Sequence, residues 1–333
     1  MDRRRRPPLT AIAVALVGLG AAVVANAGES ALRTGELSGE PVELEVAGLA
    51  AAEADAALGA AWIELVRAGD ILAAHEEAFE RAAGGPVAPE PEPWKLLVRS
   101  DDICRWSGGT AGALGGRVFR LWGFGHPVSS RPTPESIAEA VASARCDRLT
   151  ADPEARTMTA AAGTVVDFEP FARGWAVDRA LETLRSAGAP TARVRFGPLA
   201  RGYGAGPTGK GWRWEFPSLP GLVAPLQGIW LRDQAIALLR ADERPLVIAG
   251  DRLARWIDLR TGSPGAGLVA VAVVTGVAAD AEAVAWSMFG FGSRLGTAKA
   301  HELRPPPSVL WLVGNGTSQP LLVETSWSAV PKR

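Results

Sequence analysis

The segment from Gly163 to Leu184, GTVVDFEPFARGWAVDRALETL, constrains the fold of this chain more than any other stretch. The β-branched residues Val165 and Val166 give its beginning strand character, and Pro170 interrupts that run. Apolar residues then recur at helical spacing as far as Leu184. The pattern therefore predicts a short strand, a turn and an amphipathic helix in direct succession.

Polar residues stand at fixed points around this turn. Asp167 ends the expected strand, Arg173 and Gly174 open the helix, and Asp178 lies one turn further on. Free backbone N–H groups point outward at the start of a helix, so a glycine and a cation there suit an anionic ligand. Many αβ units have such a turn, and Asp178 could instead pair with Arg173 or Arg179 on a solvated surface.

The size and charge of the chain limit its possible functions. Its 333 residues are 47% hydrophobic, enough for one large domain or two smaller ones. Its formal net charge is −1, which suggests neither a nucleic-acid partner nor electrostatic binding to a membrane surface.

Residues 1–27 have the features of an export signal. Arg3 to Arg6 are basic, Leu9 to Ala25 are apolar, and Ala-Asn-Ala closes the segment as a small-x-small cleavage site. An uncleaved membrane anchor is the alternative, and it would be the chain's only contact with a membrane. The chain is therefore expected to be exported, to the periplasm or the cell envelope.

Export bears on the two cysteines. An oxidising compartment allows a disulfide between Cys104 and Cys146, and two ordinary buried thiols are equally compatible with the sequence. A zinc site is not indicated, because His75, His126 and His301 are the only histidines and show no ligand spacing.

Periodicity and breaker residues outline the rest of the chain. Residues 28–40 are expected to be a polar lead-in, and Trp94–Ile103 and Ala235–Ala241 fit either a strand or a helix. The other expected elements are an edge strand at Pro41–Val46, a helix at Leu49–Ala83, a linker at Gly84–Pro93, a helix at Pro134–Ala144 capped by Thr133, a hairpin at Leu149–Thr159, strands at Pro245–Ile248, Arg255–Asp258 and Val269–Thr275, a helix at Asp280–Phe289 and a final strand at Val309–Val313.

The segment from Gly163 to Leu184 resembles the strand–turn–helix signature of the ApbE-type FAD:protein FMN transferases, with Glu169 at a usually small position and Arg173 in place of Lys. Further matches follow in the family's order: LWGFG at Leu121–Gly125, WIDLRTGSPG at Trp256–Gly265, and VVTGVAADAEAVAWSMFGFG. The resemblance implies an α+β fold of two lobes over residues 41–325, with mixed or antiparallel sheets covered by helices and the site in the cleft between the lobes.

The resemblance also implies a reaction. The family uses Mg²⁺ to split the pyrophosphate of FAD and transfers FMN to a Thr or Ser of an acceptor protein, here expected to be an exported flavoprotein. The metal ligands implied are Asp280 and the backbone carbonyl of Ala172. The flavin-binding residues implied are Asp167, Arg173, Gly174, Asp178, Gly197, Asp258, Thr261 and Gly262.

Several positions depart from the family's pattern. The Thr expected four residues after Asp280 is Val284, which has no oxygen to offer a metal, and Pro198 removes a backbone donor from the expected glycine-rich loop. Asp280 could instead be a helix N-cap, and Asp258 with Thr261 could simply close a turn. Three interpretations remain: a working Mg²⁺-dependent flavin transferase, a non-catalytic relative that binds flavin or a partner protein, and a purely structural exported protein. The departures favour a transferase activity that is weakened or lost.

Overall fold

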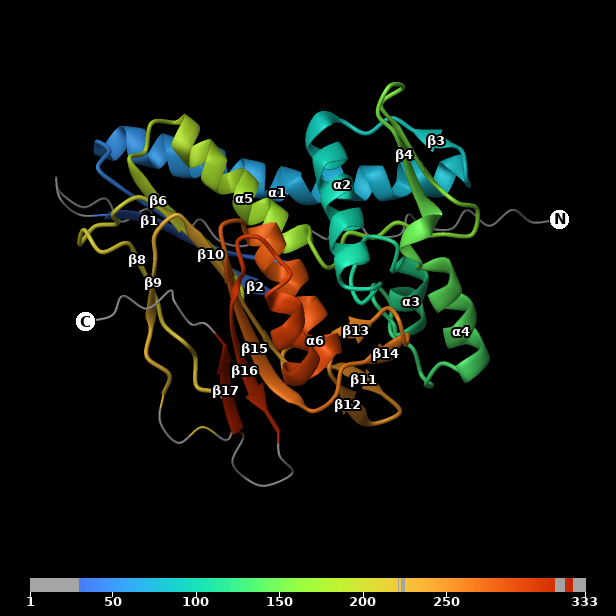
Figure 1. Ribbon diagram of the computed structural model, residues 1–333. Helices are drawn as coiled ribbons and strands as arrows, with labels where there is room; N and C mark the ends of the chain where they lie inside the picture. The colour runs from blue at the N-terminus through green and yellow to red at the C-terminus, as the bar shows by residue number, and fades with distance from the viewer. Residues whose placement is uncertain (1–29, 221, 223–224, 315–320, 326–333) are drawn as a thin grey trace.

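A single antiparallel sheet of eight strands forms the centre of the computed structural model (Figure 1), which describes residues 30–220, 222, 225–314 and 321–325. The strands pair in the order β1-β2-β6-β7-β10-β15-β16-β17, and every pair is antiparallel. Their bounds are β1 (Ser30–Leu37), β2 (Glu40–Ala47), β6 (Thr191–Phe196), β7 (Leu199–Tyr203), β10 (Gln234–Arg240), β15 (Leu268–Thr275), β16 (Ser308–Val313) and β17 (Leu321–Thr325).

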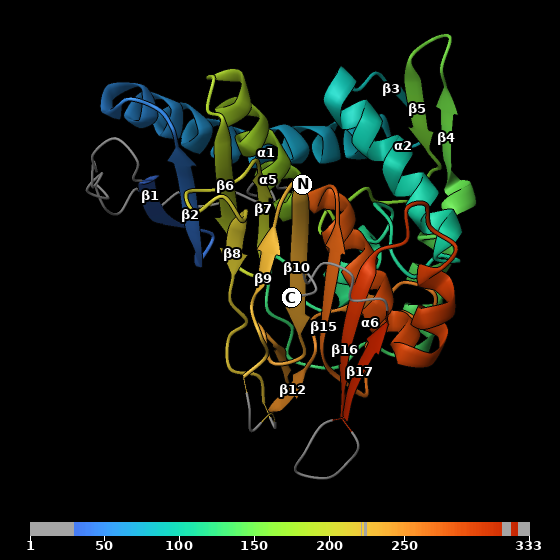
Figure 2. The same ribbon diagram turned by 60° about the vertical axis from the view of Figure 1, so that its left-hand side comes forward.

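The middle of the sheet is buried on both faces. The apolar run of β15 is buried at six of its eight positions, as expected for a strand covered on both sides. Figure 2 shows helices behind the sheet and the small β8–β9 hairpin in front of it. Those elements are α1 (Ala51–Ala82), α5 (Ala172–Ser186) and α6 (Ala278–Ala300) behind, and β8 (Trp212–Trp214) and β9 (Ile229–Leu231) in front.

The two faces differ in what covers them. On the helical face one hydrophobic cluster runs from the sheet into α1, α5 and α6 and on to the remaining helices. On the opposite face a smaller cluster centres on the buried Trp212 and Trp214 of β8. The tryptophans Trp175, Trp212, Trp214 and Trp256 are all buried.

A second group of short elements lies beyond one end of the sheet, on the right in Figure 1. It contains α2 (Pro91–Trp106), α3 (Gly116–Leu121), α4 (Pro134–Ser143), η1 (Cys146–Arg148), β3 (Pro86–Val87), β4 (Leu149–Asp152), β5 (Thr157–Ala160), β11 (Leu246–Ile248), β12 (Asp251–Leu253), β13 (Ile257–Asp258) and β14 (Ser263–Pro264). The hairpin expected at Leu149–Thr159 forms as β4 and β5, and Thr133 caps α4 as expected by accepting a hydrogen bond from the backbone of Ser136.

Several expectations about individual elements were wrong or are now decided. The polar lead-in contains β1, so β2 is not the edge strand. Val165 and Val166 form no strand and belong to an irregular connection. In this connection the carbonyl of Val165 accepts a hydrogen bond from the N–H of Gly116, and the N–H of Asp167 donates to the carbonyl of Ala113. The open assignments resolve as helix α2, which begins at Pro91 inside the expected linker, and strand β10.

The question of the two cysteines is also decided. Cys104 of α2 and Cys146 of η1 form a disulfide, with their Cα atoms 5.8 Å apart.

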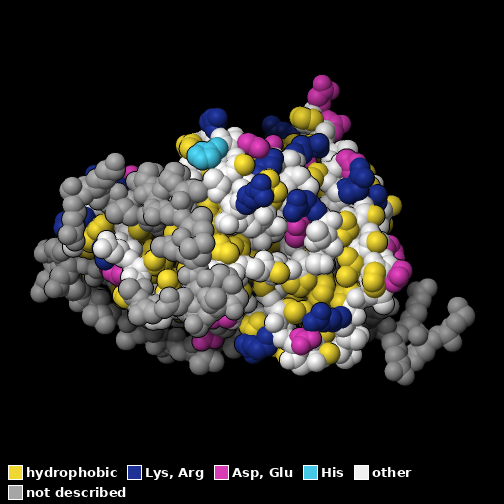
Figure 3. Space-filling view, turned by 60° about the horizontal axis from the view of Figure 1, so that its bottom comes forward, with side chains coloured by type: hydrophobic (Ala, Val, Ile, Leu, Met, Phe, Trp, Pro, Cys, Tyr) yellow, Lys and Arg dark blue, Asp and Glu magenta, His cyan; other side chains and the backbone are white. Residues whose placement is uncertain are grey.

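The signal expected at residues 1–27 lies outside the described residues. In the described part of the chain, none of the helices combines the length and apolar character needed to cross a membrane. On the face shown in Figure 3, basic and acidic side chains are interspersed.

Candidate functional site

The turn before α5 is the centre of the expected site, and its arginine is held by carboxylates of the chain itself. The Nη1 atom of Arg173 lies 3.1 Å from Glu40 Oε1 and 3.3 Å from Glu243 Oε1. Its Nε atom donates to Glu282 Oε1 at 2.9 Å. We call these four residues the Arg173 cluster.

Glu282 also takes the backbone donor that the turn offers. Its Oε2 atom accepts a hydrogen bond from the N–H of Gly174 at 2.8 Å, and its side chain is completely buried. Glu282 projects from the second turn of α6 toward the start of α5. An internal carboxylate therefore occupies the helix start at which the sequence predicted an external anion.

Gly174 has a packing role at this point. A Cβ atom on Gly174 would lie 2.4 Å from the carbonyl oxygen of Ala278, so only glycine lets the starts of α5 and α6 come this close.

Glu40 closes the cluster on its other side. It stands at the start of β2, and Arg244 Nη1 donates to its Oε1 atom at 2.7 Å. Its Oε2 atom would lie 1.8 Å from a Cβ placed on Gly197, a residue with φ of +54°. Glu40 thus covers Gly197, which lies in the expected glycine-rich loop.

Burial and charge act against each other in the Arg173 cluster. Burial would lower the pKa of Arg173, but Glu282, Glu40 and Glu243 outweigh it and raise that pKa. Burial raises the pKa of Glu282 to about 6, more than the arginine lowers it, and it also raises the pKa of Glu243. With Arg244 included, two cations face three carboxylates, so the cluster carries a surplus of negative charge once all three are ionised.

Asp178 joins α5 to α6. Its oxygens accept from the backbone N–H groups of Ala278 at 2.9 Å and Ala279 at 3.0 Å, and from Arg201 Nη1 at 2.7 Å. Burial raises the pKa of Asp178 despite these partners. The suggested pairing with Arg173 or Arg179 on a solvated surface was wrong, because Asp178 caps the first turn of α6.

Asp167 lies at the beginning of the same turn, beside other acids. Its Oδ1 atom accepts from the N–H of Glu169 at 2.9 Å, and burial and the charge of Glu169 raise its pKa to about 6. Glu76 of α1 accepts from the N–H of Phe168 at 2.9 Å, and burial together with Asp167 raises its pKa to about 8. Glu169 is itself paired with Arg255.

Asp258, Thr261 and Gly262 form the turn between β13 and β14, as their alternative interpretation predicted. The carbonyl of Asp258 accepts from the N–H groups of Thr261 and Gly262, and the carboxylate of Asp258 pairs with Arg260 at 2.7 Å. The Gly262 carbonyl accepts from Trp122 Nε1 at 2.6 Å. These polar groups of the turn therefore form hydrogen bonds or ion pairs with other groups of the chain.

The residues implied for Mg²⁺ do not fit a metal site. Both oxygens of Asp280 accept from Arg99 of α2, at 2.8 and 3.0 Å, while Glu282 is the acid that faces the turn after Ala172. Val284 is buried and apolar. Asp280 does not cap α6 either, because the N-cap position is Val277. Among the described residues no three His, Cys, Asp or Glu side chains are grouped to hold a metal ion.

The acids that define this site were not predicted from the sequence. Glu40, Glu76, Glu243 and Glu282 come from four distant parts of the chain, and only the tertiary fold brings three of them to Arg173. One local signal was available, since Glu282 is a charged residue within a run of buried, mostly alanine positions of α6.

Comparison with known proteins gives a consistent result. The model of the ApbE family matches residues 69–308. Solved structures similar to this chain include an ApbE protein of Thermotoga maritima (19% identity, TM-score 0.79, 90% of this chain and 97% of that chain). Others are the flavin transferase ApbE of Vibrio cholerae (20%, 0.75, 90% and 97%) and the flavinyl transferase ApbE of Pseudomonas stutzeri in its apo form (19%, 0.74, 90% and 95%). No curated protein sequence matches the chain.

Proposed function

The chain belongs to the ApbE family, and we propose that it is an exported member whose Mg²⁺-dependent transfer of FMN from FAD to a Thr or Ser of an acceptor protein is lost or strongly weakened. One observation carries this proposal: the glutamates of the Arg173 cluster close the anion-binding turn from within.

Electrostatics explains why this closure excludes a pyrophosphate. The donors that an anionic ligand would use, the guanidinium of Arg173 and the N–H of Gly174, already bind Glu282. A phosphate entering here would meet three carboxylates in a region of low dielectric, where repulsion is strong. It would also have to displace a fully buried side chain.

The metal position supports the same proposal. Cleavage of a pyrophosphate requires a cation on the departing phosphate, because charge develops there in the transition state. Asp280 is neutralised by Arg99, and Val284 supplies no oxygen. The described residues therefore offer no ligand set for Mg²⁺ at this position.

The disulfide supports the exported location that is part of this proposal. Disulfides persist in oxidising compartments and are rare in reducing ones, so the bond between Cys104 and Cys146 agrees with a chain that leaves the cytosol. Fusion of residues 1–27 to a reporter enzyme would test export directly.

A working transferase that flavinylates an exported acceptor is the second candidate. The observation in its favour is that Gly174 and Asp178 still hold the start of α5 against the start of α6, as a site built on both helices would need. A non-catalytic flavin carrier would require FAD to bind without the metal.

A titration of the chain with FAD, followed by flavin fluorescence with and without Mg²⁺, separates these outcomes. We expect no Mg²⁺-dependent binding and no release of AMP. The Glu282→Gln variant should gain affinity for FAD or inorganic phosphate. It removes one carboxylate that pairs with Arg173, and with it the surplus negative charge of the Arg173 cluster. Glu302→Gln, which alters an exposed acid paired with Lys299, is the control. Release of AMP by the unmodified chain in the presence of Mg²⁺ would overturn the proposal.

A further inference from the structure

An open cavity of about 1050 Å³ lies on the α4 side of the β13–β14 turn. Its size lies just above the range of roughly 300–1,000 Å³ found for small-molecule sites. None of the four residues of the Arg173 cluster lines it, and of the residues implied for flavin only Thr261 does.

The floor of this cavity is apolar. Ile137 and Val141 of α4 and Leu259 of the β13–β14 turn contribute to it. Ile137 and Val141 pack closely against Gly262, since a Cβ on that glycine would lie 2.6 and 2.8 Å from their methyl carbons. The floor therefore offers an apolar surface to a ligand.

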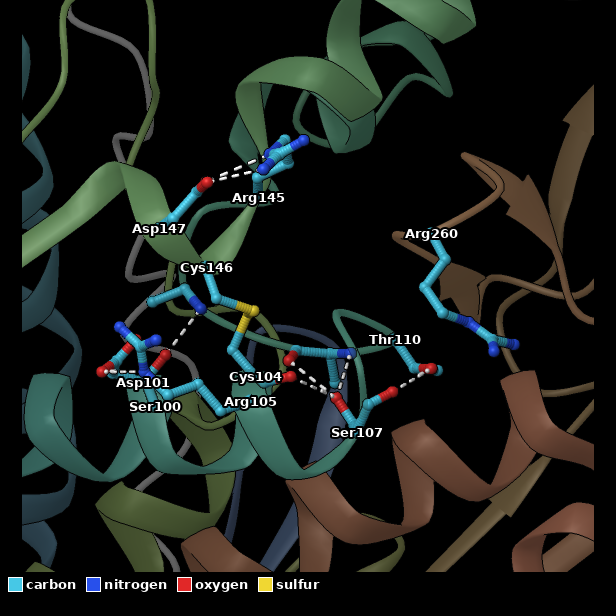
Figure 4. The surroundings of a disulfide bond; sticks show 12 residues. Ser100, Asp101, Cys104, Arg105, Ser107, Thr110, Arg145, Cys146, Asp147 and Arg260 are labelled. Carbon is cyan, nitrogen blue, oxygen red and sulfur yellow. Dashed lines mark hydrogen bonds and ion pairs between the residues drawn. A yellow bond between two sulfur atoms is a disulfide. The ribbon is translucent and has the colours of Figure 1, made fainter.

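Three arginines, each paired with one aspartate, stand around the floor. Arg145 binds Asp147 through Nε and Nη2 (Figure 4). Arg260 binds Asp258 through the same two atoms. Arg105 is paired with Asp101 through a single hydrogen bond from Nε. In the described part of the chain no acceptor bonds the Nη1 atoms of Arg145 or Arg260. The rim is thus balanced in charge but still offers guanidinium donors.

The disulfide holds one wall of the cavity. Cys146 and its neighbours Ala144, Arg145 and Asp147 line it, and the bond to Cys104 fixes them to α2. Gly108 and Gly109, which follow α2, line the cavity too, and the N–H of Gly109 donates to the carbonyl of Cys104. The disulfide therefore ties these two lining segments together.

We propose that this cavity binds a small amphipathic acid, with the apolar body on the Ile137–Val141–Leu259 floor and a single carboxylate or sulfonate at the arginine rim, and that the disulfide keeps the cavity in its binding shape. A multiply charged ligand gains little at a rim whose charges already balance. A single acid group can accept from the free Nη1 donors without displacing the aspartates.

Binding of the aromatic sulfonate 1-anilinonaphthalene-8-sulfonate to the full chain, measured by fluorescence, tests the site. Ala138→Trp places a large side chain from an exposed, cavity-lining position of α4 and should weaken binding about tenfold or more, the loss expected when a ligand's apolar contacts are blocked. Ala56→Trp, an exposed alanine of α1 outside the cavity, should leave binding unchanged. No binding, or equal binding by both variants, would overturn the site.

Displacement of the probe by competing ligands tests whether the site selects an acid group, and a variant without the disulfide tests the role of that wall. Decanoate should displace the probe at about tenfold lower concentration than 1-decanol, because only the acid accepts charge-assisted hydrogen bonds. Equal displacement by both would show that the arginines do not select an acid. A folded Cys104→Ser, Cys146→Ser double variant should bind the probe more weakly, and unchanged affinity would refute the role of the disulfide.

Discussion

The Glu282→Gln variant should be more stable than the unmodified chain at neutral pH, although it removes a buried ion pair. Burial raises the pKa of Glu282 to about 6, against 4.5 for an ordinary glutamate. Its charged form is therefore less favourable inside the fold than in the unfolded chain. This agrees with the general finding that desolvation of a buried ion pair can exceed its Coulombic attraction.

The magnitude and sign follow from linkage. A carboxyl with a raised folded-state pKa stabilises the fold fully below pH 4.5, and that contribution is lost as the pH rises through about 6. The difference between the two pKa values corresponds to about 2 kcal/mol. Glutamine is never charged, so the variant should keep this stability at about pH 7.5 and lose its advantage as the pH falls toward about 4.5. Arg173 stays paired with Glu40 and Glu243 in the variant.

Urea unfolding followed by circular dichroism at both pH values measures this difference. The expected gain at neutral pH corresponds to a rise in Tm of roughly 3 °C for a chain of 333 residues. The exposed Glu302→Gln control should differ from the unmodified chain by less than about 0.5 kcal/mol throughout. A Glu282→Gln variant that is less stable at neutral pH, or a difference that does not change with pH, would refute the reasoning.

Three further outcomes are expected. Cys104 and Cys146 are 42 positions apart in the sequence, and replacing both by serine opens the loop that the disulfide closes. The free energy of unfolding, measured by denaturant titration, should fall by about 4 kcal/mol, and a loss below about 1 kcal/mol would contradict this. Glu76→Gln should flatten the fall in stability as the pH rises through about 8, where burial and Asp167 place the pKa of Glu76, and an unchanged pH profile of unfolding would count against that raised pKa. Val284→Thr should leave Mg²⁺ affinity unmeasurable by calorimetry, because Arg99 already neutralises Asp280; a gain would show that the metal site survives.

Much of the fold could be predicted from periodicity alone. The apolar run at Val269–Thr275 and the Pro-free stretch at Leu49–Ala83 correspond to β15 and α1 within a few residues. Strand β1 gave no such signal, because Ser30–Leu37 is an edge strand with no buried residue and no apolar face. Its strand conformation comes from pairing with β2, which is a tertiary contact.

The candidate site was less predictable, because its chemistry depends on distant side chains. The helix start at Arg173 and Gly174 was placed correctly as a site that attracts anions. The anions that bind there are Glu40, Glu243 and Glu282, and no local pattern around α5 indicates them. Asp280 was assigned by its spacing in the motif, yet it faces Arg99 of α2, while Glu282, two residues later, faces the turn.

The close contact between Gly174 and Ala278 has a consequence for how proteins of this family are recognised. The glycine of the signature is required by the meeting of two helices, and Asp178 of the same signature caps one of them. Both would remain necessary after the flavin chemistry had gone. A match to this signature in the present chain therefore reports a helix junction, and the chemistry of the site depends on the side chains that surround it.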